Sequence, residues 1–216
     1  MRIKALILCG VLASIIYTVT VILGGILRPG YSHISQFISE LIATGAPNKP
    51  ILDPLFALYN LLTIVFGVGL VMTVRAASEM RRKVIGTLGA LILVAEGVFG
   101  FVTVFFPQDP VGTAITSTGT MHIVLAGLSS LTTMLSMLLM GFWFRTQPGL
   151  QSYGRYSFIS VAVVFVFGGL AAVMGVNSSP IVGIMERITI GGFLQWLFII
   201  ALKLYSFRGM VTVPSR

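Results

Sequence analysis

The sequence contains few charged residues. Only 9% of its 216 residues are Asp, Glu, Lys or Arg, whereas a soluble domain carries roughly 25% because its surface must meet water. Apolar residues make up 56% of the chain, and the mean hydropathy is +1.00. These values exclude a water-soluble domain and an intrinsically disordered chain, so most of the perimeter of the protein must face lipid.

Cysteine and catalytic sequence motifs are also scarce. The single cysteine, Cys9, excludes a disulfide scaffold and a cysteine cluster for a metal. The two histidines do not form His-x-x-x-His or His-Glu-x-x-His, and Gly-x-Ser-x-Gly does not occur. We therefore expect no cofactor, and the local sequence carries no signature of an enzyme.

Long apolar runs dominate what remains. Six of them are close to the ~20 residues that a helix needs to cross the hydrocarbon core. The predicted spans are 5–27, 55–74, 84–106, 119–144, 156–176 and 186–204. The first run exceeds the ~7–15 apolar residues of a secretory signal, so we expect it to be a retained helix. The sequence thus predicts an all-α fold, a six-helix transmembrane bundle in which residues 1–216 form one integral membrane domain.

The distribution of basic residues predicts the orientation of this bundle. Eleven of the fourteen Lys and Arg fall on the side of the N-terminus. They are Arg2, Lys4, Arg75, Arg81, Arg82, Lys83, Arg145, Arg155, Lys203, Arg208 and Arg216. The positive-inside rule then places both termini in the cytoplasm of a multi-pass protein of the cell membrane. The net charge of +8 follows from this bias and from attraction to anionic headgroups, so we expect membrane lipids as partners and no nucleic acid. The sequence does not identify a protein partner.

The first predicted external loop, 28–54, contains an amphipathic pattern. Apolar side chains recur at helical spacing, while three polar side chains share another face: Ile34, Phe37, Ile38 and Leu41 against His33, Gln36 and Glu40. This pattern predicts a short amphipathic helix along the outer membrane surface. Such a helix would either simply cover the bundle or contribute its polar face to a site.

Most side chains capable of acid–base or metal chemistry are predicted to lie at the external end. Asp109 sits in a turn flanked by prolines, His122 lies one turn into the fourth helix, and Glu186 with Arg187 opens the sixth. We expect one external polar pocket formed by His33, Glu40, Asp109, His122, Glu186 and Arg187. Arg187 should pair with Asp109 or Glu40, because a partly buried Arg without an anion is costly.

Two polar residues fall inside the predicted spans. Glu96 lies near the middle of the third span, where an ionisable group costs about 3 kcal/mol on insertion scales and normally faces the bundle interior. It could form a structural clamp with Asn60 or a hydroxyl of the fourth helix, line a binding pocket, or serve in a proton or ion relay. The relay is disfavoured because the inner half of the bundle offers no further ionisable group. We therefore add Asn60 and Glu96 to the candidate binding residues.

Small and polar residues recur on one face of the fourth predicted helix. They are Gly119, His122, Ala126, Ser129, Thr133 and Ser136. Small faces allow membrane helices to approach closely, so packing accounts for most of this pattern.

Several segments resemble the domain-of-unknown-function family 998. They are Arg28-Pro29-Gly30-Tyr31-Ser32-His33, Ser39-Glu40-Leu41, Gly45-Ala46-Pro47, Phe106-Pro107-Gln108-Asp109-Pro110, Gly119-Thr120-Met121-His122, Gly183-Ile184-Met185-Glu186-Arg187-Ile188 and Trp196. The resemblance implies a prokaryotic multi-pass membrane protein and supplies no catalytic roles. In outline the chain also resembles the Frag1/DRAM/Sfk1 group of six-span proteins, some of which are linked to lipid or lipid-anchor handling.

Three classes of function remain open. The first is a binding protein whose external polar pocket takes a lipid headgroup or another amphiphile. The second is a membrane-embedded hydrolase or transferase, metal-dependent or not, with His122 as base or metal ligand and His33, Glu40, Asp109 and Glu186 nearby. The third is a structural or assembly protein. An apolar groove that opens sideways would favour lipid binding, and a rim closed by salt bridges would favour the structural role.

Overall fold

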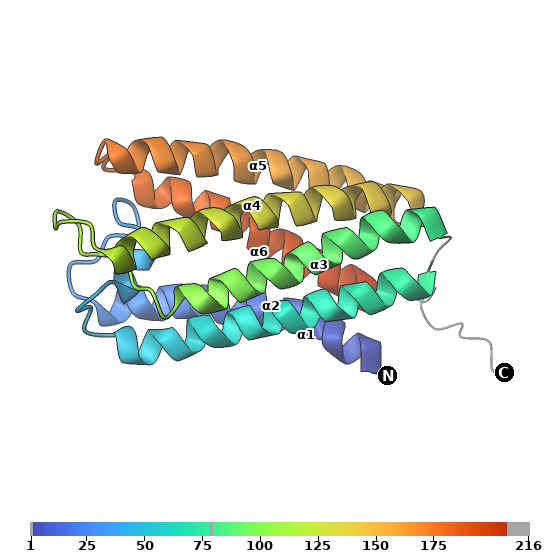
Figure 1. The fold of residues 1–216 in the computed structure, drawn as a ribbon, viewed down its shortest axis with the longest axis horizontal. Coiled ribbons are helices and arrows are strands. Elements are labelled where there is room, and N and C mark those ends of the chain that lie inside the picture. The colour runs from blue at the N-terminus through green and yellow to red at the C-terminus, as the bar shows by residue number, and fades with distance from the viewer. Residues whose placement is uncertain (1, 78–79, 207–216) are drawn as a thin grey trace.

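Six long helices build the protein. The computed structural model describes residues 2–77 and 80–206, and no strand occurs in this part of the chain. The helices are α1 (Arg2–Leu27), α2 (Lys49–Ala77), α3 (Met80–Thr103), α4 (Ser117–Thr146), α5 (Gln151–Val176) and α6 (Val182–Ser206), as Figure 1 shows. All six are long and apolar enough to cross a membrane. The predicted all-α bundle of six membrane helices is therefore confirmed. Glu79, Arg208 and Arg216 lie outside the described residues, and so do the side chains of Arg2 and Arg81.

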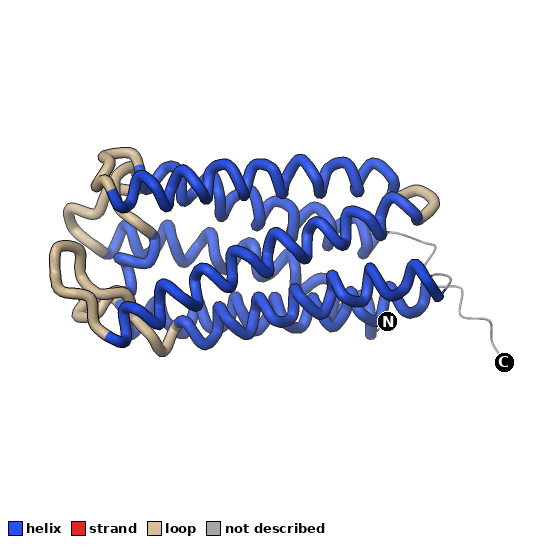
Figure 2. The backbone as a smooth tube through the Cα atoms, turned by 45° about the horizontal axis from the view of Figure 1, so that its top comes forward, coloured by secondary structure: helices blue, strands red, loops and turns tan. Residues whose placement is uncertain are grey.

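The helices form a closed ring. Each helix packs along its neighbours in the sequence, and α6 returns to pack on α1 (Figures 1 and 2). Glycines allow the close approach: a Cβ on Gly67 of α2 would lie 2.7 Å from Val94 of α3, and one on Gly141 of α4 would lie 2.7 Å from Phe158 of α5. Close packing at such small residues stabilises contacts between membrane helices, because lipid supplies no hydrophobic drive between them.

The two ends of the ring differ. We call one end the loop end, because the connections 28–48, 104–116 and 177–181 lie there (Figure 2). At the opposite end, the terminal end, α1 begins, α6 ends and a short turn joins α4 to α5. Large side chains fill the ring near the terminal end: Phe66, Trp143 and Trp196 are 0%, 2% and 0% exposed. The core of the bundle is therefore concentrated in the terminal half.

The first loop closes the loop end of the ring. Its helical part, η1 (Ile38–Ile42), is a 3-10 helix of five residues, shorter than the amphipathic pattern predicts. Phe37 and Ala43 on either side are extended. Ile38, Leu41 and Ile42 are buried, and η1 packs against α1, α2 and α6. The apolar side chains of η1 thus insert into the bundle, whereas Ile34 before it is 54% exposed.

Candidate functional site

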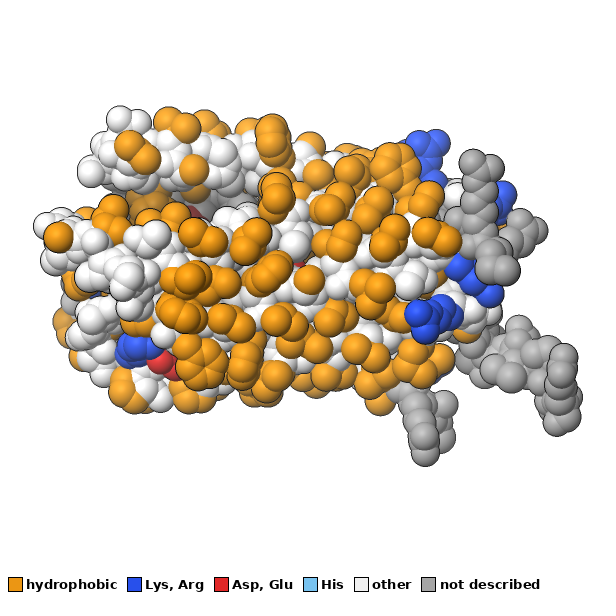
Figure 3. All heavy atoms as spheres, viewed as in Figure 1, with side chains coloured by type: hydrophobic (Ala, Val, Ile, Leu, Met, Phe, Trp, Pro, Cys, Tyr) orange, Lys and Arg blue, Asp and Glu red, His pale blue; other side chains and the backbone are white. Residues whose placement is uncertain are grey.

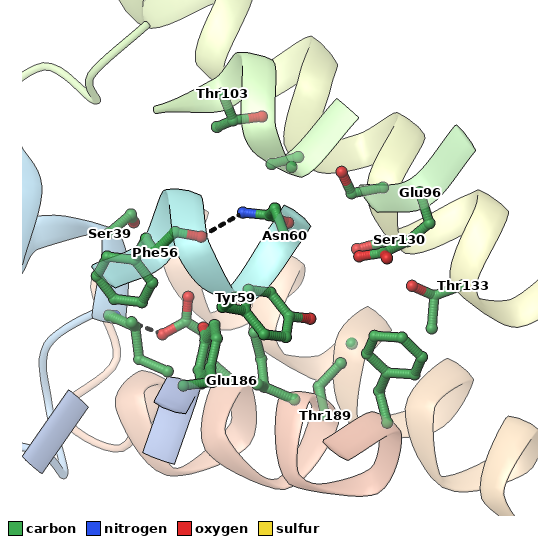
Figure 4. Close-up of a pocket in the computed structure, with 18 of the residues that line it drawn as sticks. Ser39, Phe56, Tyr59, Asn60, Glu96, Thr103, Ser130, Thr133, Glu186 and Thr189 are labelled. Carbon is green, nitrogen blue, oxygen red and sulfur yellow. Dashed lines mark hydrogen bonds between the residues drawn. The ribbon is translucent and has the colours of Figure 1, made fainter. Parts of the chain in front are cut away.

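A cavity lies inside the ring, between η1 and the filled terminal half. Its volume is about 310 Å³, and all six helices contribute to its wall. This volume is at the lower end of the range that ligand pockets occupy. Its polar wall includes Asn60 of α2, Glu96 and Thr103 of α3, His122, Ser129, Ser130 and Thr133 of α4, and Glu186 and Thr189 of α6 (Figure 4).

Glu96 and Asn60 face this cavity without bonding to each other. Their side chains are only 5% and 4% exposed. The Asn60 amide nitrogen donates to the Phe56 carbonyl of its own helix at 2.8 Å, as Figure 4 shows. Asn60 Oδ1 and Glu96 Oε2 are both buried without a hydrogen-bond partner. The clamp expected between Glu96 and Asn60 is therefore not formed.

Glycine at position 100 fixes where the Asn60 amide lies. A Cβ on Gly100 would fall 2.1 Å from Asn60 Oδ1, so the amide packs directly on the surface of α3. Gly100 follows Glu96 by four residues and therefore shares its helix face. Asn60 Oδ1 of α2 thus lies against α3 one turn away from Glu96.

His122 and Glu186 are anchored by loop backbone on the other walls. His122 Nδ1 is 2.8 Å from the Phe106 carbonyl oxygen. A carbonyl only accepts, so Nδ1 carries the proton and Nε2 of a neutral ring keeps its lone pair. Glu186 Oε2 accepts from the Ile38 backbone N–H at 2.6 Å. The loop segments therefore orient both side chains at the cavity.

Arg187 and His33 lie in a second hollow, between α1 and α6. Its volume is about 330 Å³, and it is lined mostly by apolar side chains. Arg187 donates to the Gln36 and Gly183 carbonyls, each at 2.9 Å, and to the Tyr31 hydroxyl at 2.5 Å. Its Nη2 is also 3.1 Å from His33 Nδ1. Arg187 thereby joins the first loop to the start of α6.

The expected ion pair of Arg187 with Asp109 or Glu40 is wrong. Among residues 2–77 and 80–206, the salt bridge found is the one between Lys49 and Asp53. Main-chain carbonyls and the Tyr31 hydroxyl bind the two terminal nitrogens of the guanidinium instead, and its Nε is buried without a hydrogen-bond partner. The rim is therefore not closed by charge pairs in this part of the chain.

The surroundings of Arg187 shift two neighbouring groups. Burial raises the pKa of Tyr31 to about 12, although the positive charge of Arg187 opposes this shift. Burial, followed by the same charge, lowers the pKa of His33 below its usual value near 6.5. A neutral His33 ring can accept from Arg187, which agrees with the short Nη2 to Nδ1 distance.

Asp109 and Glu40 bond within their own loops. The two oxygens of Asp109 accept from the backbone N–H and the hydroxyl of Thr116, at 2.7 and 2.9 Å. Thr116 in turn caps α4 by accepting from the Gly119 N–H at 3.1 Å. Glu40 accepts from the Phe37 N–H at 2.8 Å and from Gln36 Nε2 at 2.9 Å.

The eight candidate residues are thus divided between separate places. Asn60, Glu96, His122 and Glu186 line the central cavity, and His33 and Arg187 line the second hollow. Asp109 and Glu40 line neither. A binding role for these residues stays a prediction. No group of three His, Cys, Asp or Glu that could hold a metal ion occurs within the described ranges.

The central cavity opens sideways between α4 and α5, a feature that the sequence did not reveal. Ala126 and Ser130 line the cavity, yet both are exposed. A Cβ on Gly127 of α4 or on Gly169 of α5 would meet nothing within 4 Å. Figure 3 shows this face hollowed between α5 and α4, with acidic side-chain atoms visible inside.

The small residues of α4 therefore have two roles. Ser136, nearer the terminal end, donates to the Gly89 carbonyl of α3 at 2.8 Å and serves in packing, as predicted. His122, Ala126, Ser129 and Thr133 line the cavity instead. The spacing of small residues is the same in both halves of α4. It therefore does not distinguish small residues that contact a neighbouring helix from small residues that line an opening.

Comparison with known proteins identifies the family. The family model described as "Protein of unknown function (DUF998)" matches residues 11–203, nearly the whole chain. No curated protein and no solved structure matches the chain. The chain is a multi-pass membrane protein and belongs to the DUF998 family.

Proposed function

We propose that this protein binds an amphiphile in the membrane. The polar end of the amphiphile occupies the central cavity, and its apolar part leaves between α4 and α5. The observation that carries the proposal is a set of three buried polar atoms that line the cavity without a hydrogen-bond partner. They are Asn60 Oδ1, Glu96 Oε2 and Ser129 Oγ.

Unpartnered buried atoms of this kind are costly. Most buried polar groups in folded proteins are paired, and leaving one unpaired costs about 1–3 kcal/mol. Three such atoms around one cavity would be stabilised together by a single ligand that supplies their partners. A purely structural bundle would gain by replacing them with apolar side chains.

The side opening supports an amphiphile over a water-soluble ligand. Around it, α5 exposes Phe165 and Val173 at 66% and 62%, and α4 exposes Ile123 at 61%. In a six-span membrane protein these side chains face hydrocarbon. A ligand that enters between α4 and α5 would therefore carry an apolar portion that remains among them.

We place the loop end outside the cell, in the cell membrane, with both termini in the cytoplasm. Basic side chains gather at the terminal end (Figure 3). Among the described residues, the basic ones at the loop end are only Arg28, Lys49 and Arg187. The positive-inside rule favours this orientation. The cavity would then receive its ligand from the outer half of the membrane.

The proposal is tested by blocking the opening. Ala126→Phe places a large ring at the opening, whereas Leu131→Phe adds a ring to an exposed position of α4 that does not line the cavity. Native mass spectrometry of protein extracted in a mild neutral detergent measures the amphiphile that is retained. We expect wild type and Leu131→Phe to retain it and Ala126→Phe to lose most of it. Equal retention by all three proteins, or none by wild type, would contradict the proposal.

A further inference from the structure

Several hydrogen-bond donors around the central cavity are engaged by the protein itself. The Asn60 amide donates to the Phe56 carbonyl, and His122 Nδ1 donates to the Phe106 carbonyl. The hydroxyls of Thr103 and Thr189 donate to carbonyls of their own helices, at 2.7 and 2.8 Å. The hydroxyls of Thr103 and Thr189 and the ring of His122 then offer acceptors to the cavity, whereas the Asn60 amide keeps a second N–H.

The acceptors, in contrast, remain available. Asn60 Oδ1 and Glu96 Oε2 have no partner, and Nε2 of a neutral His122 keeps its lone pair. Ser129 Oγ is also unpartnered, and a hydroxyl can either donate or accept. A ligand with several N–H donors can satisfy these acceptors, and the hydroxyls of Tyr17, Tyr59, Ser130 and Thr133, which line the same cavity, can also accept from it.

The charged side chains of the cavity wall also favour a ligand with N–H donors, and in particular a cation. Two carboxyl groups, those of Glu96 and Glu186, line the cavity, and no Lys or Arg is among the described residues that do so. A carboxylate held inside a membrane bundle is costly without a partner, and a bound cation offsets that cost. Figure 4 shows both carboxyl side chains reaching into the same space from α3 and α6.

Aromatic rings complete the wall. Tyr17, Phe56 and Tyr59 line the cavity, and the Tyr17 ring contacts the other two edge to face at centroid distances of 5.3 and 4.7 Å. Aromatic faces attract cations, and they do so more strongly where water is excluded. Carboxyl groups and aromatic rings together are typical of an ammonium site.

From these observations we infer that the polar end of the bound amphiphile is a primary ammonium group held at Glu96. This inference rests on the proposed function and names the chemistry of its ligand. A primary ammonium has three N–H donors and no acceptor, which complements Glu96 Oε2 and Asn60 Oδ1. A quaternary ammonium lacks N–H groups and would leave both oxygens unpaired, and an anionic headgroup would meet two carboxyl groups.

The test compares two probes of equal chain length. Thermal stabilisation of the purified full-length protein in a neutral maltoside detergent is measured at increasing concentrations of decylamine and of 1-decanol, at pH 7. We expect wild type to bind decylamine about tenfold more tightly than decanol or better, because a charge-assisted hydrogen bond contributes more than a neutral one. Glu96→Gln should lose this preference while still binding decanol.

A matched variant controls for net charge and for partition into micelles. Asp53→Asn also removes one carboxylate, but Asp53 pairs with Lys49 and does not line the cavity. It should keep the preference for decylamine. Glu186→Gln is the second cavity variant, because its amide oxygen can still accept from Ile38, and it should also weaken decylamine binding. If Glu96→Gln fails to fold, the preference of Glu186→Gln for decylamine over decanol decides the test.

The outcomes separate the two proposals. Equal binding of decylamine and decanol by wild type, or an unchanged preference in the folded cavity variants, would overturn the ammonium site. The amphiphile function would still stand if wild type retains a ligand that Ala126→Phe loses. Retained phosphatidylethanolamine would identify a lipid headgroup as the source of the amine, whereas competition by free ethanolamine would identify a small amine.

Discussion

At the scale of single residues, the polar groups of this protein are satisfied by backbone more often than by each other. Arg187 illustrates this: its bonds go to two carbonyls, to Tyr31 and to His33, and to no carboxylate. The sequence indicates that such a residue needs partners, but it does not show which loop carbonyls the fold brings to it. Glu96 was identified from its depth in a span, whereas its lack of a partner depends on how the helices around it pack.

We expect the contact between His33 of the first loop and Arg187 of α6 to depend on pH. Burial and the charge of Arg187 lower its pKa in the folded protein, so the unfolded chain binds the proton more readily. Neutral His33 contributes fully to stability at pH values above the histidine pKa of the unfolded chain, which is near 6.5. This contribution is lost as the pH falls through the lower pKa of the folded protein. We therefore expect the thermal midpoint of wild type to fall more than that of His33→Gln between pH 8 and pH 5. The other ionisable groups are the same in both proteins, so parallel curves would contradict a role for His33.

At the scale of elements, the helices were predictable and the first loop was only partly so. Each helix follows from an apolar run of sufficient length, which is a local property of the sequence. The amphipathic pattern of 34–41 correctly marks Ile38 and Leu41 as side chains that must be covered, but not Ile34, which is 54% exposed. Whether they lie on the membrane or enter the bundle depends on the gap that the ring of helices leaves at this end. In the structure Leu41 is 1% exposed, so the bundle provides the cover.

The contact between the first loop and α6 depends on a glycine. A Cβ on Gly183 would lie 2.5 Å from the Gln36 oxygen and 2.8 Å from the His33 oxygen, and backbone atoms cannot rotate away. We expect Gly183→Ala to reduce the free energy of unfolding by ~1–3 kcal/mol, as overpacking does.

Gly191 of the same helix is the matched control for this substitution. A Cβ at Gly191 would meet nothing within 4 Å. Gly191→Ala should be neutral or stabilise by up to ~1 kcal/mol, because Ala is the better helix former. Thermal unfolding of both variants in one detergent measures the difference. Similar stability of the two variants would show that the loop does not depend on close packing at Gly183.

At the scale of the whole molecule, the packed core and the candidate site lie in different halves of the ring. The terminal half is filled by Phe66, Trp143, Trp196 and their neighbours, while the loop half holds the cavity and its opening. The sequence predicted one external pocket of six residues, but only His122 and Glu186 of these line the central cavity, together with Asn60 and Glu96 from the spans. It could not predict the division into two hollows, because that depends on which helices close the ring. Tyr17 of α1 and Ile190 of α6 line both hollows, and these two helices come together only when the ring closes.

The orientation of the ring decides which face of the membrane supplies a ligand, and it can be measured directly. In a Cys9→Ala background, a single cysteine is placed at Val111, which is 69% exposed at the loop end, or at Ser152, which is exposed at the start of α5. The charge bias predicts that Val111→Cys reacts with an impermeant maleimide in intact cells. Ser152→Cys should react only after the cells are permeabilised, and that second step also controls for its accessibility. The reverse pattern would place the loop end in the cytoplasm, and the cavity would then draw its ligand from the inner half of the membrane.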